Sequence, residues 1–223
     1  MASINPGVGD GDARPVPGLF REVGERRDDA SGGPGMGGEA WLEGRAWQIA
    51  ADEEALWIAA HTRPGLAITS AIPAVFDAYA TLLVPDCEEQ RLSDNALLAL
   101  LRAHSPDQPW WLGYLETGAS YVVFPDAPRV RLYSGWDYVL VKAGPDQAAS
   151  WRTYAAALPW HGALPELIFP LDHSWLVSTL WDDDWRCLGG PTSLVTGLLD
   201  HPQLEARAVA LDEDATPPGH HAR

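Results

Sequence analysis

The sequence predicts an α+β fold: a single twisted, mainly antiparallel sheet of about five or six strands, with three or four helices packed mainly on one face. Three observations support this class. Short segments rich in β-branched and aromatic residues flank turn residues, as Arg129–Tyr133 and Trp136–Ala143 flank Ser134-Gly135. Apolar residues at helical spacing occur between such segments, as in Leu97 to Leu101. Strict strand–helix–strand alternation is missing from the sequence, which disfavours a parallel sheet.

Elements in the first half of the chain are predicted from composition and turn residues. Good helix formers between the tryptophans predict a helix within 40–56. Leu56–Thr62 and Leu66–Ile72 flank Arg63-Pro64-Gly65, which predicts a hairpin. Ala74–Val84 is apolar enough for a strand or a short helix, and periodicity leaves both open.

The leucine-rich segment that follows predicts a helix with clear ends. Ser93 or Asp94 can cap its N-terminus, and it ends near His104. Trp110–Glu116 is then a strand that returns through Tyr121–Phe124. Both faces of the first of these strands are apolar, so either helices cover both faces or one face meets something else.

The last third of the chain predicts two helices and three strands. A helix begins at Gly144-Pro145, because proline suits the first helical turn. Ser174–Trp181 is a strand beside Arg186–Leu188. Pro191 opens the last helix, and Leu204–Val209 is an edge strand.

One domain between two tails is the expected organisation, since 223 residues fit a single domain. Residues 1–38 are rich in Gly, Pro, Asp and Arg and are expected to be disordered. The ordered domain spans 39–211, and 212–223 form a second disordered tail.

Charge and cysteine content restrict the function classes. The formal net charge of −16 argues against binding nucleic acid or an anionic membrane through a basic surface, but it suits a basic protein partner or simple solubility. Cys87 and Cys187 lie far apart and match no metal or disulfide motif, so no cofactor is expected. No leader or long apolar run is found in the sequence, which predicts a cytoplasmic protein.

Several motifs resemble a family of uncharacterised actinobacterial proteins. The similarity begins at Ile72-Pro73, continues through Trp110–Tyr114, and is strongest at Phe169–Asp172 and Gly189-Gly190. The resemblance implies no chemistry, because that family has no assigned activity. At the level of architecture alone, the expected fold is similar to the SUKH immunity domains, acidic α+β proteins that neutralise toxins by binding them.

The densest candidate site is the acidic run Asp182-Asp183-Asp184, which Trp181 and Trp185 flank. Its carboxylates can form a solvated turn, contact an arginine-rich partner or hold Mg²⁺ or Ca²⁺, although the EF-hand spacing is not present. Trp111 and Trp136 lie on strands, where they either fill the core or provide a binding surface.

The leading hypothesis is a non-enzymatic protein-binding domain, immunity-like or adaptor-like, whose acidic and aromatic surface contacts a basic protein. Its contact residues are Trp111, Trp136, Trp181, Asp182, Asp183, Asp184 and Trp185. A first alternative is a small metal-dependent hydrolase built around Asp172, His173 and Asp182–Asp184. A second alternative is a structural component of a larger assembly.

Overall fold

A computed structural model of the chain describes residues 37–42, 44–85, 87–116, 123–133, 135–151, 164–180 and 183–220. The expected N-terminal tail, 1–38, therefore lies outside the described residues apart from its last two positions. Trp181 and Asp182 of the candidate site also lie outside them. In the described part of the chain no helix has both the length and the apolar character needed to span a membrane.

The ten strands of the described residues form one antiparallel sheet, in the order β1-β2-β6-β4-β7-β8-β9-β3-β10, with β5 paired to β6 beside β2. The strands are β1 (Gly38–Leu42), β2 (Arg45–Ile49), β3 (Ala78–Leu83), β4 (Trp110–Leu115), β5 (Val130–Leu132), β6 (Trp136–Ala143), β7 (Leu167–Pro170), β8 (Leu176–Ser178), β9 (Trp185–Gly190) and β10 (Ala206–Ala208). The prediction of five or six strands is thus wrong. The difference lies in the N-terminal hairpin, where local composition indicates a helix, in the four-residue strand β7, and in β3, where periodicity leaves strand and helix open.

The N-terminal hairpin replaces the helix expected within 40–56. β1 and β2 pair from Gly38 opposite Ile49 to Leu42 opposite Arg45, and Gly44 takes a positive φ of 79° in the turn. In β2, Trp47 and Ile49 are buried while Gln48 is exposed, which is the two-residue period of a strand. Burial of that alternating face outweighed the helix propensity of the segment.

Residues 56–72 form helical turns rather than the expected hairpin. A 3₁₀ turn, η1 (Asp52–Ala55), leads into α1 (Leu56–His61), and a second 3₁₀ turn, η2 (Ile68–Ser70), follows the Arg63-Pro64-Gly65 bend. Helical turns put Ile58 and Ile68 into the core, where both are fully buried. The bend itself was predicted correctly, but it connects helical turns and not strands.

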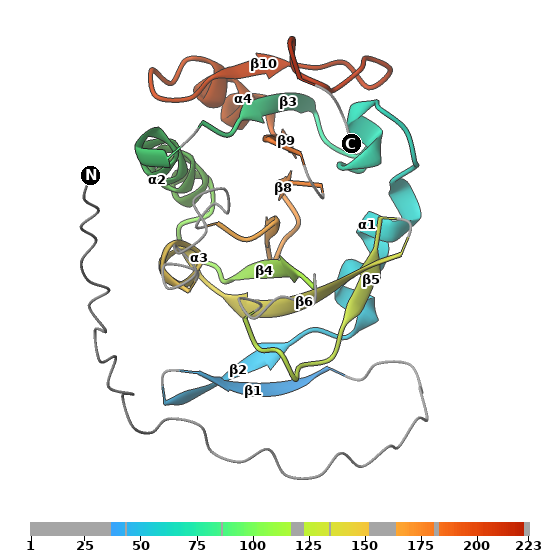
Figure 1. Ribbon diagram of the computed structural model, residues 1–223, viewed down its shortest axis with the longest axis vertical. Coiled ribbons are helices and arrows are strands. Elements are labelled where there is room, and N and C mark those ends of the chain that lie inside the picture. Colours follow the sequence, from blue (N-terminus) through green and yellow to red (C-terminus); the bar gives the residue numbers. More distant parts are fainter. Residues whose placement is uncertain are drawn as a thin grey trace, which may run out of the picture. The chain divides into compact units, whose positions relative to one another are not determined.

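Helices lie on both sides of the sheet (Figure 1), and a cluster of buried apolar side chains fills the space on each side. One cluster contains side chains of α2 (Cys87–His104), α3 (Pro145–Ser150) and α4 (Thr192–Leu199). The other contains Ile58 of α1 and Ile68 of η2. All six residues of β4 are buried, with Trp110 in the first cluster and Trp111 in the second. The apolar character of both β4 faces is thus explained by helical cover on both sides.

Helix α2 begins at Cys87, before the cap expected at Ser93 or Asp94. Both of those residues are buried inside the helix, and a carboxylate oxygen of Asp94 lies 2.7 Å from Arg186 on β9. The side-chain oxygen that suggested a helix cap therefore serves an ion pair between helix and sheet.

Most elements predicted after residue 109 are confirmed: the strand β4, the β5–β6 hairpin, the start of α3 behind Gly144, the pairing of β8 with β9, helix α4 and the edge strand β10. The return strand over Tyr121–Phe124 is wrong where it can be examined. Val123 and Phe124 are not in a strand, and β4 pairs with β6 and β7 instead.

The residues from Asp212 to His220, called the C-terminal strap below, are packed on the domain rather than disordered as expected. Ala215 is only 4% exposed, and its N–H donates to the Leu66 carbonyl at 2.8 Å. An isolated bridge pairs Asp214 with Ala67. Composition alone did not reveal these contacts, because they depend mainly on backbone groups.

Candidate functional site

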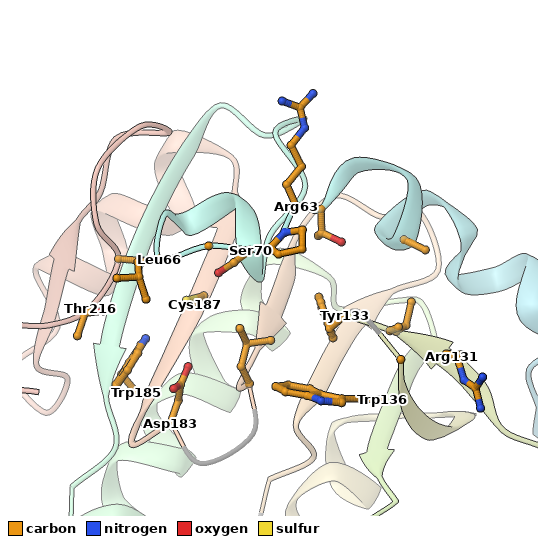
Figure 2. A pocket seen from close by; sticks show the side chains of 18 residues that line it. Arg63, Leu66, Ser70, Arg131, Tyr133, Trp136, Asp183, Trp185, Cys187 and Thr216 are labelled. Atoms are coloured by element: carbon orange, nitrogen blue, oxygen red, sulfur yellow. The ribbon is translucent and has the colours of Figure 1, made fainter. Parts of the chain in front are cut away.

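A cavity of about 490 Å³ opens on the face of the sheet covered by α1 (Figure 2). Four segments that are distant in the sequence line it: the end of α1 with the following bend, the β5–β6 turn, the β8–β9 connection with β9, and the C-terminal strap. The lining residues are Ala59, Thr62, Arg63, Pro64, Gly65, Leu66, Ser70, Arg131, Leu132, Tyr133, Gly135, Trp136, Leu180, Asp183, Trp185, Cys187, Ala215 and Thr216.

The β5–β6 turn supplies the aromatic side of the cavity through Tyr133 and Trp136. Tyr133 has a φ of 45°, an uncommon backbone conformation for a bulky residue, and the N–H of Gly135 donates to the Leu132 carbonyl across the turn. The Tyr133 hydroxyl donates to the Ala71 carbonyl at 3.1 Å. These bonds fix the ring of Tyr133, while Trp136 stays partly exposed at the cavity.

The connection between β8 and β9 supplies the acidic side. Asp183 lines the cavity, and its backbone N–H donates to the Leu180 carbonyl at 3.2 Å. The carboxylate of the next residue, Asp184, lies 2.8 Å from Nδ1 of His220. Trp185 follows at the start of β9 and is 4% exposed, so its indole is a wall of the cavity rather than an open surface.

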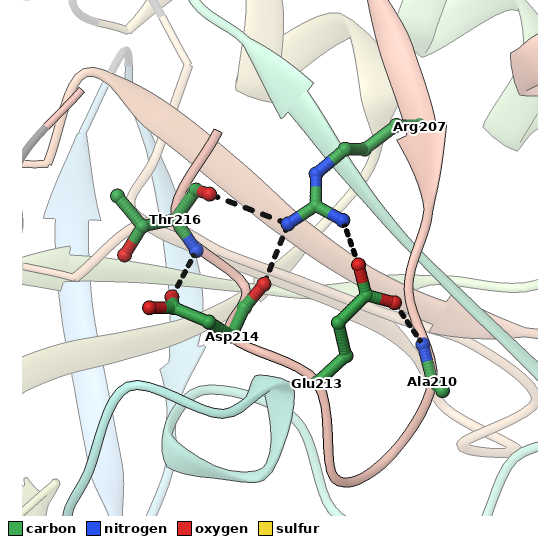
Figure 3. Close-up of polar contacts among 5 residues, drawn as sticks. All are labelled: Arg207, Ala210, Glu213, Asp214 and Thr216. Atoms are coloured by element: carbon green, nitrogen blue, oxygen red, sulfur yellow. Dashed lines mark hydrogen bonds and ion pairs between the residues drawn. The ribbon is translucent and has the colours of Figure 1, made fainter. Parts of the chain in front are cut away.

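The C-terminal strap closes one end of the cavity with Ala215 and Thr216. Arg207 on β10 holds this strap through the Glu213 carboxylate and the carbonyls of Asp214 and Thr216 (Figure 3). Glu213 also accepts a hydrogen bond from the Ala210 N–H. The pKa of the Glu213 carboxyl is lowered by the Ala210 hydrogen bond and by Arg207.

Two arginines line the cavity, and only one of them is paired with a carboxylate of the described residues. Arg131 donates from Nε and Nη2 to the two carboxylate oxygens of Asp137, at 2.9 and 3.4 Å. Arg63 is exposed, and its guanidinium has no ion-pair or hydrogen-bond partner among the described residues. In Figure 2 the Arg63 side chain extends away from the other labelled side chains.

Two ionisable groups in the cavity wall, Cys187 and Tyr133, are held in their protonated forms. Burial raises the pKa of the Cys187 thiol to about 12, and the neighbouring Asp183 carboxylate adds to the increase. Burial likewise raises the pKa of Tyr133 far above its ordinary value. Near neutral pH this wall therefore offers neither a thiolate nucleophile nor a phenolate base.

The residues predicted as contact residues are only partly brought together. Trp136, Asp183 and Trp185 line the cavity, whereas Asp184, which lies between two of them in the chain, pairs with His220. Trp111 is 2% exposed and packs in the core, so this contact prediction is wrong. Nζ of Lys142 lies 5.9 Å from the centroid of the Trp111 ring, and the indole remains buried.

Asp172 and His173, the acid–base pair of the hydrolase alternative, lie in the turn between β7 and β8 and do not line the cavity. Burial acts to raise the pKa of Asp172, but hydrogen bonds from Gln108 and Ser174 together outweigh it, so the pKa is lowered. His173 stacks on Trp57 at 4.5 Å, and burial lowers its pKa against the opposing effect of Asp172. Among the described residues, no three His, Cys, Asp or Glu side chains gather to form a metal site.

The sequence motifs do not single out three residues of the cavity, Arg63, Tyr133 and Cys187. Two sequence signals could have found them. Cys187 is two residues after Trp185 on one strand, so the two share a face. Arg63 and Tyr133 each adjoin a predicted bend, where side chains of different elements converge.

Comparisons with protein-family models, with curated proteins and with solved structures found no match to this chain.

Proposed function

We propose that the chain is a non-enzymatic protein-binding domain, immunity-like or adaptor-like, that contacts a basic protein at the cavity lined by Trp136 and Asp183, with the exposed Asp184 following Asp183 in the chain. The observation that carries the proposal is that Trp136 and Asp183, which come from distant parts of the sequence, line one cavity. An indole offers a large rigid contact area of the kind that is enriched at binding hot spots, and a carboxylate in the same cavity adds a negative charge that a cation can pair with.

The charge of the whole chain supports a basic partner. A formal net charge of −16 attracts a positively charged protein over a distance comparable to the Debye length, about 10 Å at 0.1 M salt. This attraction accelerates encounter, and the cavity then provides the specific contact.

The protonated state of Cys187 and Tyr133 favours binding over catalysis. A nucleophilic enzyme needs an activated group in its cleft, and here burial raises both pKa values. The metal-dependent hydrolase is supported less well, because Asp172 and His173 lie at a different turn from Asp183.

Affinity capture with the tagged full chain, from an extract of its source organism, tests the proposal. We expect a basic protein to be captured at low salt and released as salt rises. Asp183→Asn and Trp136→Ala should each reduce its capture. The matched controls are Asp107→Asn, an exposed carboxylate away from the cavity, and Trp41→Ala, a tryptophan that is 73% exposed on β1.

Capture that all four variants retain equally would contradict the proposed site. Capture that is insensitive to salt would contradict the charge-based choice of partner.

A further inference from the structure

We infer that the cavity receives one arginine side chain of the basic partner, with its guanidinium paired to the Asp183 carboxylate and stacked on the Trp136 indole. This inference rests on the proposed function and makes it specific. It names the chemical group that is recognised and the residues that recognise it.

The cavity is large enough for such a side chain, and its lining offers apolar and aromatic contacts. Its volume of about 490 Å³ lies within the range of pockets that enclose small ligands, about 300–1,000 Å³. Leu66 and Leu180 in the wall can pack against the aliphatic part of an arginine. Tyr133 and Trp136 provide aromatic surface for the planar guanidinium.

His220 of the C-terminal strap already contacts an acidic and an aromatic residue of the β8–β9 connection. Nδ1 of His220 lies 2.8 Å from the Asp184 carboxylate, and its ring lies 6.3 Å from the Trp185 ring. The imidazole of His220, a planar group that contains nitrogen, thus contacts both a carboxylate and an indole. Asp183 and Trp136 offer the same two kinds of group in the lining of the cavity.

The chain also stacks a guanidinium on an indole elsewhere. The guanidinium carbon of Arg45 lies 3.4 Å from the centroid of the Trp47 ring. Such stacking is available to arginine and much less to lysine, because the guanidinium is planar and weakly hydrated. A carboxylate can in addition accept two parallel hydrogen bonds from arginine, which favours arginine over lysine.

The two arginines that line the cavity differ in whether a carboxylate balances their charge. The charge of Arg131 is balanced by Asp137, to which it is bonded. Arg63 is unbalanced among the described residues and lies at the cavity, where it opposes a second cation. Removing the charge of Arg63 should therefore strengthen arginine binding, whereas removing the charge of Asp183 should weaken it.

Titration of the full chain with capped amino acids tests the inference without a partner protein. The probes are Nα-acetyl-arginine amide, its lysine counterpart and its citrulline counterpart, which has nearly the shape of arginine but no charge. Tryptophan fluorescence and heteronuclear NMR shifts report binding. We expect saturation by the arginine probe in the millimolar range, and affinities at least about tenfold lower for citrulline.

Variants locate the binding. Asp183→Asn should reduce the affinity for arginine to the level of citrulline, and Trp136→Ala should reduce the discrimination between arginine and lysine. Arg63→Gln should raise the affinity. Asp107→Asn and Trp41→Ala should leave the titration unchanged.

Equal binding of arginine and citrulline by the wild-type chain would overturn the inference, as would undetectable binding of the arginine probe. Neither result depends on the folding of a variant. If protein capture still required Asp183 in that case, the proposed binding function would survive and only the arginine receptor would be rejected.

Discussion

Asp94 on α2 and Arg186 on β9 illustrate how strongly one pair of side chains can constrain this fold. Their charged atoms are 2.7 Å apart, and both side chains are 5% exposed. A charge this deeply buried needs its partner, because water no longer solvates it. The exposed pair of Arg131 and Asp137 is a natural contrast, since water solvates both of its members.

Asp94→Ala should lower the free energy of unfolding by about 3–5 kcal/mol, because it leaves the Arg186 charge buried and unpaired. Asp137→Ala should lower it by less than about 1 kcal/mol. Urea denaturation followed by circular dichroism measures both values. Similar small losses for the two variants would show that the buried pair is not a constraint.

Cys187 gives the stability of the protein a dependence on alkaline pH. Burial raises the pKa of its thiol from an ordinary value of 9.0 to about 12, so the folded chain holds its proton where the unfolded chain has lost it. Stability from this group is complete below pH 9 and declines as pH rises toward 12. Between pH 9 and pH 10, wild type should lose about 1 kcal/mol more than Cys187→Ala.

Chemical denaturation of both proteins at the two pH values measures that difference. Tyr133 and Tyr138 are also buried with raised pKa values, but they are present in both proteins and their effect cancels. Parallel pH dependence of the two proteins would mean that the thiol is accessible to water.

At the scale of elements, glycines allow close packing within the sheet. An added Cβ at Gly113 of β4 would lie 2.7 Å from Cβ of Leu167 on β7, whereas one at Gly38 of β1 would meet nothing within 4 Å. Gly189 resembles Gly113, because its added Cβ would lie 2.5 Å from Ile72 and Phe76. Gly189 and Gly190 therefore belong to a closely packed part of β9.

Gly113→Ala should destabilise the protein by about 1–3 kcal/mol through overpacking. Gly38→Ala is the matched control and should change stability by less than about 0.5 kcal/mol. Thermal melts of the two variants compare them directly. A Gly113→Ala variant as stable as Gly38→Ala would show that β4 and β7 separate easily.

One arginine of the neighbouring strand, Arg207, contacts three residues of the C-terminal strap: Glu213, Asp214 and Thr216. Arg207→Gln should increase the rate of amide hydrogen exchange at Ala215, whose N–H is bonded to Leu66. Arg102→Gln, which removes the exposed pair with Asp146, should leave that rate unchanged. Exchange at Ala215 that is equally slow in both variants would assign the strap's order to its backbone contacts alone.

How far the sequence predicts an element depends on whether its signal is local. The β5–β6 hairpin was predictable, because Ser134-Gly135 separates two strand-like segments. The β1–β2 hairpin was not, because pairing of β2 with β6 overrides local helix propensity. The residue types at Trp136 and Asp183 suggested binding, but nothing local indicated that they share a cavity with Arg63.

At the scale of the whole molecule, helices cover both faces of the sheet, so the proposed partner is expected at the cavity and not on a sheet face. β4 is buried on both sides, so the central strands cannot meet a partner face to face. The cavity lies between the bend after α1, the β5–β6 turn, β9 and the C-terminal strap, whose side chains do not fill the space. This arrangement and the net charge are the basis of the proposed contact with a basic protein.

Hydrogen–deuterium exchange of the full chain, alone and bound to its captured partner, tests the binding site most directly. We predict slower exchange on binding in Arg131–Asp137, in Asp183–Cys187 and in the C-terminal strap, with little change in α2. Slower exchange confined to α2 and α4, or to the β1 edge, with these three segments unchanged, would contradict the account.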